Sequence, residues 1–159
     1  MNTTTRTTRE CSLDSLNPTL RAAMLDHAAQ YNLGDLEADM VMCCETTSVH
    51  PKKGMFGSVE TTISAVFLTP KWLIWADSTD QNHAGVGSAQ LRQIDVRDYE
   101  TTAMNAISPD LGLNITGRYT DRNKTGMSFI VLGSGPDGQK FRHVLKDAIK
   151  KVLTEHVPA

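Results

Sequence analysis

The sequence has little of what marks several large classes of protein. Its 159 residues carry a net charge of −2 and offer no general attraction to nucleic acids or anionic membranes. No apolar run is long enough to cross a bilayer, which predicts no transmembrane segment. The N-terminal stretch MNTTTRTTRECS has no apolar run after its arginines, so we expect no secretory signal. These absences predict a cytoplasmic protein that binds no nucleic acid.

Cysteine is also scarce. The chain has three cysteines, Cys11, Cys43 and Cys44. An odd number without an export signal predicts free thiols rather than a disulfide framework. Cys43 and Cys44 are neighbours in an apolar stretch, where they would point to opposite faces of a strand. We expect both to act as small apolar side chains.

The length bounds the domain organisation. A chain of this size can bury a core without metals or disulfides, and it fits one domain with a short extension. Residues 1–13 are polar and rich in Thr, which predicts a disordered tail. Residues 14–37 predict a helical extension, in which Asn17 caps a helix and Pro18 occupies its first turn. The main domain is predicted to span residues 38–156.

Short alternating segments between turn residues predict a run of antiparallel strands in the main domain. These segments are 41–49, 59–68, 72–76, 89–100, 111–119 and 127–132. The apolar phase of the fourth segment shifts between Leu91 and Ile94, which predicts a β-bulge. Thr69-Pro70-Lys71 predicts a tight turn, because proline presets the turn dihedral.

The last segment carries the clearest periodicity in the chain. Its apolar residues recur at helical spacing, and they are Phe141, Val144, Leu145, Ala148, Ile149, Val152 and Leu153. Lysines and other charged residues lie off this stripe. The pattern predicts a C-terminal amphipathic helix whose apolar face packs on the sheet.

Strands followed by one terminal helix predict a mostly β fold of the α+β class. Residues 67–75, FLTPKWLIW, resemble the second hairpin of bacterial pleckstrin-homology-like and GRAM-type domains, and residues 88–96 look like their following strand. Pro70 and Trp72 depart from the residues usual in those families. The resemblance covers roughly residues 38–155. It implies an open barrel of two antiparallel sheets with a C-terminal capping helix, and the N-terminal helix is then an addition packed outside.

Three short patterns imitate ligand sites. Residues 133–138 match G-x-G-x-x-G, but no parallel strand follows, so we interpret them as a strand-to-helix turn. Residues 121–126 match half of a calcium loop but lack the glutamate at its twelfth position. Residues 77–87 predict a polar loop, in which Asp77, Asp80 and His83 lack the spacing of a closed zinc site. The sequence thus predicts no catalytic residue, no cofactor and no metal.

One loop is the candidate ligand-binding site. In lipid-binding pleckstrin-homology domains the first hairpin carries basic residues that hold phosphates, and Lys52 and Lys53 stand at that place here. The strand that follows has no Lys or Arg, and two lysines are weak phosphate clamps. Met55 and Phe56 lie between glycines and would form an apolar tip.

These residues predict a non-catalytic binding module for a protein or peptide. Weak binding of phospholipid headgroups is the alternative. Self-association through the loop stays open, as does a plain solvated turn.

Overall fold

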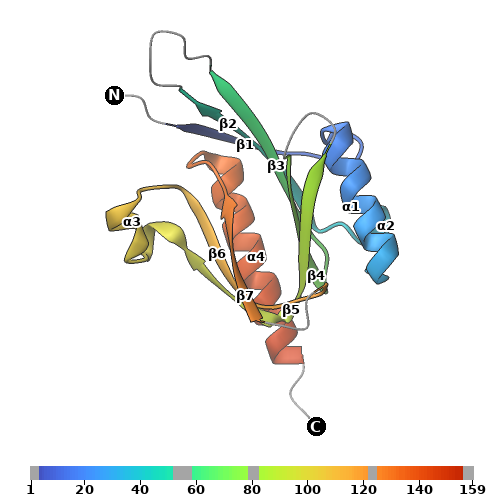
Figure 1. The fold of residues 1–159 in the computed structure, drawn as a ribbon. Helices are drawn as coiled ribbons and strands as arrows, with labels where there is room; N and C mark the ends of the chain where they lie inside the picture. The colour runs from blue at the N-terminus through green and yellow to red at the C-terminus, as the bar shows by residue number, and fades with distance from the viewer. Residues whose placement is uncertain (1–3, 52–58, 79–82, 122–124, 156–159) are drawn as a thin grey trace.

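The computed structural model describes residues 4–51, 59–78, 83–121 and 125–155. Seven strands form one antiparallel sheet in chain order (Figure 1). The strands are β1 (Thr5–Glu10), β2 (Met42–His50), β3 (Glu60–Leu68), β4 (Trp72–Ser78), β5 (Ala84–Asp98), β6 (Gly112–Tyr119) and β7 (Thr125–Val131). The helices are α1 (Pro18–Tyr31), α2 (Leu36–Asp39), α3 (Met104–Ile107) and α4 (Pro136–Glu155), with a 3₁₀ turn at Tyr99–Thr101. The mostly β class and the C-terminal helix are as the sequence predicts.

The long strand β5 bends the sheet into two walls. Its pairing with β6 shifts register between Ala89 and Ile94, so the predicted bulge is confirmed. Gly117 of β6 lies so close to this bend that a Cβ there would sit 2.2 Å from the Gln93 carbonyl oxygen. The first half of β5 pairs with β4 and the second half pairs with β6. The two predicted sheets are therefore one continuous sheet that shares β5 (Figure 1).

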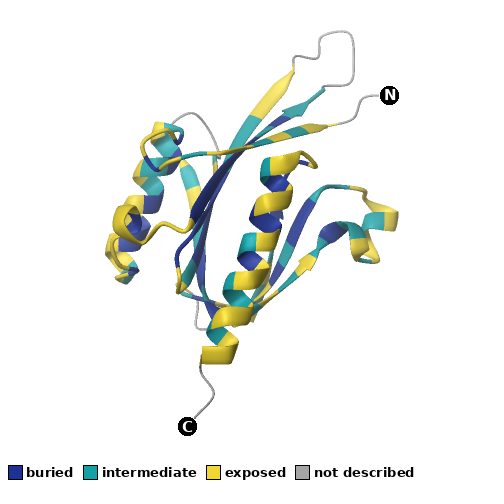
Figure 2. Cartoon of the chain, turned by 180° about the vertical axis from the view of Figure 1, so that it is seen from behind, coloured by how far each residue is buried: buried dark blue, intermediate teal, exposed yellow. Residues whose placement is uncertain are grey.

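Helices cover both faces of the first wall. Helix α4 packs in the angle between the walls, where Phe141 and Leu145 are fully buried (Figure 2). Helix α1 packs on the opposite face of β4 and β5, through Leu20 and Met24. The Asn17 side chain accepts hydrogen bonds from the first turn of α1, as predicted. The expected outer placement of the N-terminal helix is confirmed.

The predicted disordered tail over residues 1–13 is wrong for the part that the structure describes. Residues Thr5–Glu10 form β1, which pairs with β2 along its whole length. The Arg6 guanidinium donates hydrogen bonds to both Asp110 carboxylate oxygens, at 2.7 and 2.8 Å, and to the Ser48 hydroxyl at 2.6 Å. The tail's polar composition was misleading, because these partners come from distant segments of the chain.

Side chains, rather than a strand ladder, join the two edges of the sheet. No ladder pairs β1 with β7 in the described part of the chain, so the barrel is not closed. The Gly133 N–H donates to Thr8 Oγ1 at 2.8 Å, and Thr46 Oγ1 donates to the Val131 carbonyl at 3.3 Å. A Cβ at Gly133 would lie 2.6 Å from the Arg6 carbonyl oxygen. Gly133 therefore allows the strand-to-helix turn to approach β1.

Helix α4 differs from its predicted pattern at two positions. Leu153, assigned to the apolar stripe, is 57% exposed in the last turn. Arg142, assigned to the polar side, is buried. Its guanidinium donates at 2.9 Å to Asp98 and to both oxygens of Glu100. The helix thus docks through an ion pair as well as through its apolar face.

Candidate functional site

The loop singled out from the sequence lies outside the described residues. Lys52, Lys53, Met55 and Phe56 therefore remain a predicted ligand site. The strands that lead into and out of the loop are fixed by His50, whose ring contacts the Thr4 and Thr62 hydroxyls, each at 3.1 Å.

A different site lies between the β4–β5 and β6–β7 hairpins. A pocket of about 370 Å³ elsewhere on the surface is lined by Lys71 and Arg92, but the pocket between the hairpins, about 330 Å³, combines charge with buried aromatic rings. It is lined by Trp75, Asp77, Gly85, Val86, Gly87, Tyr119, Asp121, Met127 and Ser128. Trp75 belongs to the core cluster that faces α4, so the pocket opens on the inner face of the bent sheet.

Two glycines of β5 shape the floor of this pocket. A Cβ at Gly85 would meet no atom within 4 Å, so the backbone of β5 is open to the pocket there. A Cβ at Gly87 would lie 2.5 Å from the Trp75 indole, which packs directly on the glycine. Gly85 pairs with Asp77 and Gly87 pairs with Trp75 across the ladder. Gly85 therefore leaves space for a ligand, while Gly87 provides the flat surface on which the Trp75 ring packs.

The back of the pocket is aromatic. Trp75 and Tyr119 meet edge to face, with ring centroids 5.3 Å apart, a favoured geometry for such pairs. The Tyr119 hydroxyl donates a hydrogen bond to the Ser128 hydroxyl, which orients the ring. Trp75 is only 7% exposed. The pocket therefore has a mostly buried aromatic back wall.

Two carboxylates stand at the rim. Asp77 lies near the end of β4, on the same face as Trp75, and Asp121 lies two residues after the end of β6. Both are exposed to solvent, and neither has a cationic partner within the described ranges. Burial by the surrounding chain raises the pKa of Asp77, although its carboxylate still reaches water. A cation placed between the two carboxylates would lower that pKa again, so the rim is suited to a positively charged group.

A second polar arrangement looks like a catalytic pair and is not one. His27 Nε2 lies 2.7 Å from the Ser88 hydroxyl, which donates to the Thr120 hydroxyl at 2.8 Å. Ser88 has no exposed surface and His27 only 8%, so no substrate can reach the serine. Burial lowers the pKa of His27 and keeps the ring neutral near pH 7. This chain of hydrogen bonds links α1 to β5 near the start of its bend.

The Arg142 cluster is also structural. Burial alone would raise the pKa of Asp98 and Glu100. Hydrogen bonds from Lys146 and Arg142 to Asp98, and from Arg142 to Glu100, outweigh burial and hold both pKa values below their usual range. Lys146 adds a bond to Asp98 at 2.8 Å. These groups tie α4 to the end of β5 and leave no free carboxylate for proton transfer.

The other sequence patterns fall in separate places. Asp77 lies in β4 and His83 just before β5, so the predicted loop over 77–87 is shorter than expected. Asp80 lies outside the described residues. Within the described ranges, no three His, Cys, Asp or Glu side chains gather as a metal site. No helix there is long and apolar enough to span a membrane.

No protein-family model, curated protein or solved structure matches this chain. The chemistry of the pocket is therefore the basis from which we infer a function. Sequence reasoning missed the pocket because Gly85 and Gly87 were assigned to a loop. The available signal was the spacing of these two glycines, which places them on one face of a strand.

Proposed function

We propose that this chain is a non-catalytic binding module that takes a lysine or arginine side chain of a protein or peptide into the pocket between the β4–β5 and β6–β7 hairpins. The observation that carries the proposal is the pair of rim carboxylates, Asp77 and Asp121, which line the same pocket as the Trp75 and Tyr119 rings. A basic side chain suits this lining, since it is a cation with N–H donors for the two carboxylates.

The chemistry of the rim favours a cation over an anion. Two carboxylates would repel a phosphate, whereas each can accept a charge-assisted hydrogen bond from an ammonium or guanidinium group. The volume of about 330 Å³ holds one long side chain rather than a folded element. The rim is open to water, so binding should be moderate in strength and sensitive to salt.

The resemblance to pleckstrin-homology-like domains is compatible with this role. It implies a binding scaffold rather than an enzyme, and the bent antiparallel sheet with its C-terminal helix agrees with the coarse features of such a scaffold. A fold of this kind can host many activities, so the lining of the pocket carries more weight than the resemblance.

The test is an array of Lys- and Arg-containing peptides, followed by titration of the best binder. The neutral isostere Asp77→Asn should weaken binding by about 10- to 100-fold, which corresponds to the loss of one hydrogen bond to a charged group. Asp121→Asn should act in the same direction. Asp147→Asn, an exposed carboxylate on α4, is the matched control and should bind like the wild type.

Two results would contradict the proposal. One is equal binding of neutral and basic peptides, and the other is equal loss in the Asp147→Asn control. Flotation with phosphoinositide-containing vesicles tests the lipid alternative. Lipid binding that is lost in Lys52→Ala and kept in Asp77→Asn would replace the peptide proposal.

A further inference from the structure

Two of the three cysteines face each other across neighbouring strands. Cys11 directly follows β1, and its N–H donates to the Cys43 carbonyl at 2.9 Å, which continues the register of β1 on β2. The two Sγ atoms are 3.4 Å apart, within hydrogen-bonding distance. Both thiols lie on the face covered by α1. The strand pairing therefore holds two sulfur atoms together from positions far apart in the sequence.

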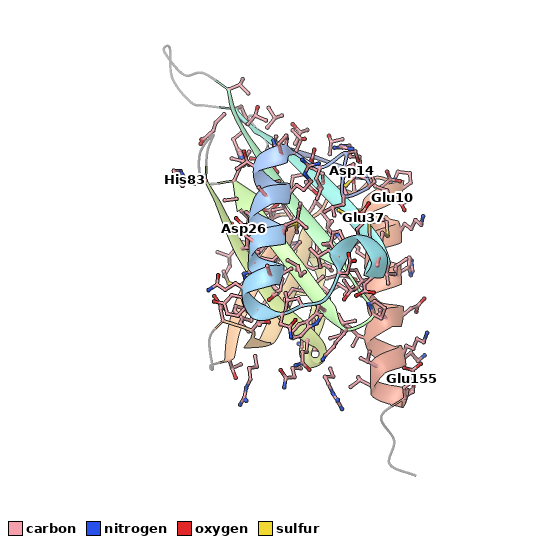
Figure 3. All side chains as sticks on the ribbon, turned by 90° about the vertical axis from the view of Figure 1, so that its right-hand side faces the viewer. Glu10, Asp14, Asp26, Glu37, His83 and Glu155 are labelled. Atoms are coloured by element: carbon pink, nitrogen blue, oxygen red, sulfur yellow. The ribbon has the colours of Figure 1, made fainter. Side chains whose placement is uncertain are left out.

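The two thiols differ in access. Cys43 has no exposed surface, while Cys11 is half-buried. Figure 3 shows Glu10 and Asp14, on either side of Cys11 in the sequence, at the surface near the start of α1 and the upper end of α4. A small oxidant can therefore reach Cys11 but not Cys43.

Cys44 provides an internal comparison. It is as buried as Cys43 but points to the other face of β2, where its Sγ lies 4.0 Å from the Asp137 carbonyl oxygen. Burial raises the pKa of its thiol to about 12. Cys44 thus lacks both access and a sulfur neighbour on its own face.

The more accessible thiol, Cys11, is also the one that ionises more readily. The side-chain hydrogen bond between Cys11 and Cys43, together with the nearby Arg9 guanidinium, lowers the pKa of Cys11 against the opposing effect of burial. The pKa of Cys43 is raised by its hydrogen bond to Cys11 and by burial. Cys11 is therefore the thiol that reacts first as a thiolate.

We propose that Cys11 and Cys43 form a reversible disulfide when the protein meets a hydroperoxide. The Cys11 thiolate attacks one peroxide oxygen and breaks the O–O bond, which yields a sulfenic acid and releases water once the leaving hydroxide takes a proton. The Cys43 sulfur then attacks the Cys11 sulfur, forms the S–S bond and expels the sulfenic oxygen, which leaves with the Cys43 proton as water. With hydrogen peroxide, two thiols lose two electrons and two protons and give one disulfide and two waters.

The geometry needs little adjustment for this step. A disulfide bond is about 2.05 Å long, so the two sulfur atoms must approach from 3.4 Å by side-chain rotation and a small shift of the strands. The product would close a loop that carries α1 and α2 and would fasten β1 to β2 covalently. Such a cross-link limits the unfolded chain, so the oxidised protein should unfold at a higher temperature.

The test uses the full chain treated with hydrogen peroxide after complete reduction. We expect thiol titration in denaturant to fall from three thiols to one, peptide mapping to recover a Cys11–Cys43 link, and dithiothreitol to restore all three. The midpoint of thermal unfolding should rise by several degrees on oxidation. Cys44→Ser should behave like the wild type, while Cys11→Ser should form no disulfide and keep its remaining thiols.

Three outcomes would overturn the proposal. They are irreversible oxidation of Cys11 to a sulfinic acid without a linked peptide, a link between chains instead of within one chain, and loss of thiols in Cys11→Ser at the same rate as in the wild type. Circular dichroism of each reduced variant confirms that the fold is intact. Because Cys11→Ser changes a half-exposed side chain, it keeps the test valid even where Cys43→Ser does not fold.

Discussion

Gly85 and Gly87 lie two residues apart on one face of β5, yet substitution should have opposite effects at the two positions. A Cβ at Gly85 enters the open pocket and meets nothing within 4 Å. A Cβ at Gly87 enters the Trp75 indole at 2.5 Å. Neither glycine has a positive φ, so backbone strain does not obscure the comparison.

The magnitudes follow from these surroundings. Gly85→Val restricts the unfolded chain and adds a good strand former, which should stabilise the fold by about 0.5–1 kcal/mol. Gly87→Val has the same two favourable effects, but its side chain would displace the Trp75 ring. Overpacking of this kind costs about 1–3 kcal/mol. The free energies of unfolding of the two variants should therefore differ by about 1–3 kcal/mol, with Gly85→Val the more stable.

Equilibrium unfolding in urea measures this difference, and an unchanged dependence on denaturant shows that the transition is still two-state. Gly85→Val should also weaken binding of basic peptides, because its side chain occupies the pocket. Gly135→Ala, at another glycine with open surroundings, is the control and should leave peptide binding unchanged. Equal destabilisation by Gly85→Val and Gly87→Val would refute the description of the pocket floor.

Three further results are expected. Leu145→Ala should lower the free energy of unfolding by about 2–5 kcal/mol, since the side chain is fully buried between the walls, and a near-wild-type melting temperature would contradict this packing. The carboxylates that bind Arg142 have lowered pKa values, so their contribution to stability is present above about pH 4 and is lost as the pH falls through their folded values. An acid titration of the melting temperature should show this loss, and Arg142→Met should flatten that part of the profile. If the predicted loop site binds a partner through its apolar tip, Phe56→Ala should weaken capture or self-association and Lys52→Ala should not; the reverse result in a pull-down would favour phosphate recognition.

Local signals in the sequence were sufficient for the elements with regular side-chain patterns. Helix α4 follows from the spacing of its apolar residues, and the bend of β5 follows from the phase shift between Leu91 and Ile94. The cap at Asn17 depends only on the backbone N–H groups of the helical turn that follows it. Such features depend on neighbours within a few residues, so the sequence displays them directly.

Features that depend on distant partners were not visible. Thr8 and Arg6 look like parts of a polar tail until Thr46 and Asp110 are placed beside them. The binding pocket requires two hairpins to be brought together, and nothing local marks Asp121 as a neighbour of β4. Arg142 likewise looks like a surface residue until the end of β5 supplies its carboxylates.

The hydrogen bond between Thr8 and Gly133 also bears on the order of events during synthesis. Its two ends are separated by 125 positions in the chain. β1 is synthesised before the other strands of this sheet, but its partners include all of β2 and the turn before α4, which are synthesised later. Contacts that span so much chain form late and slow the approach to the native state. We therefore expect β1 to be among the last strands to gain all its partners, and its polar composition disfavours pairing of its free edge with other chains in the meantime.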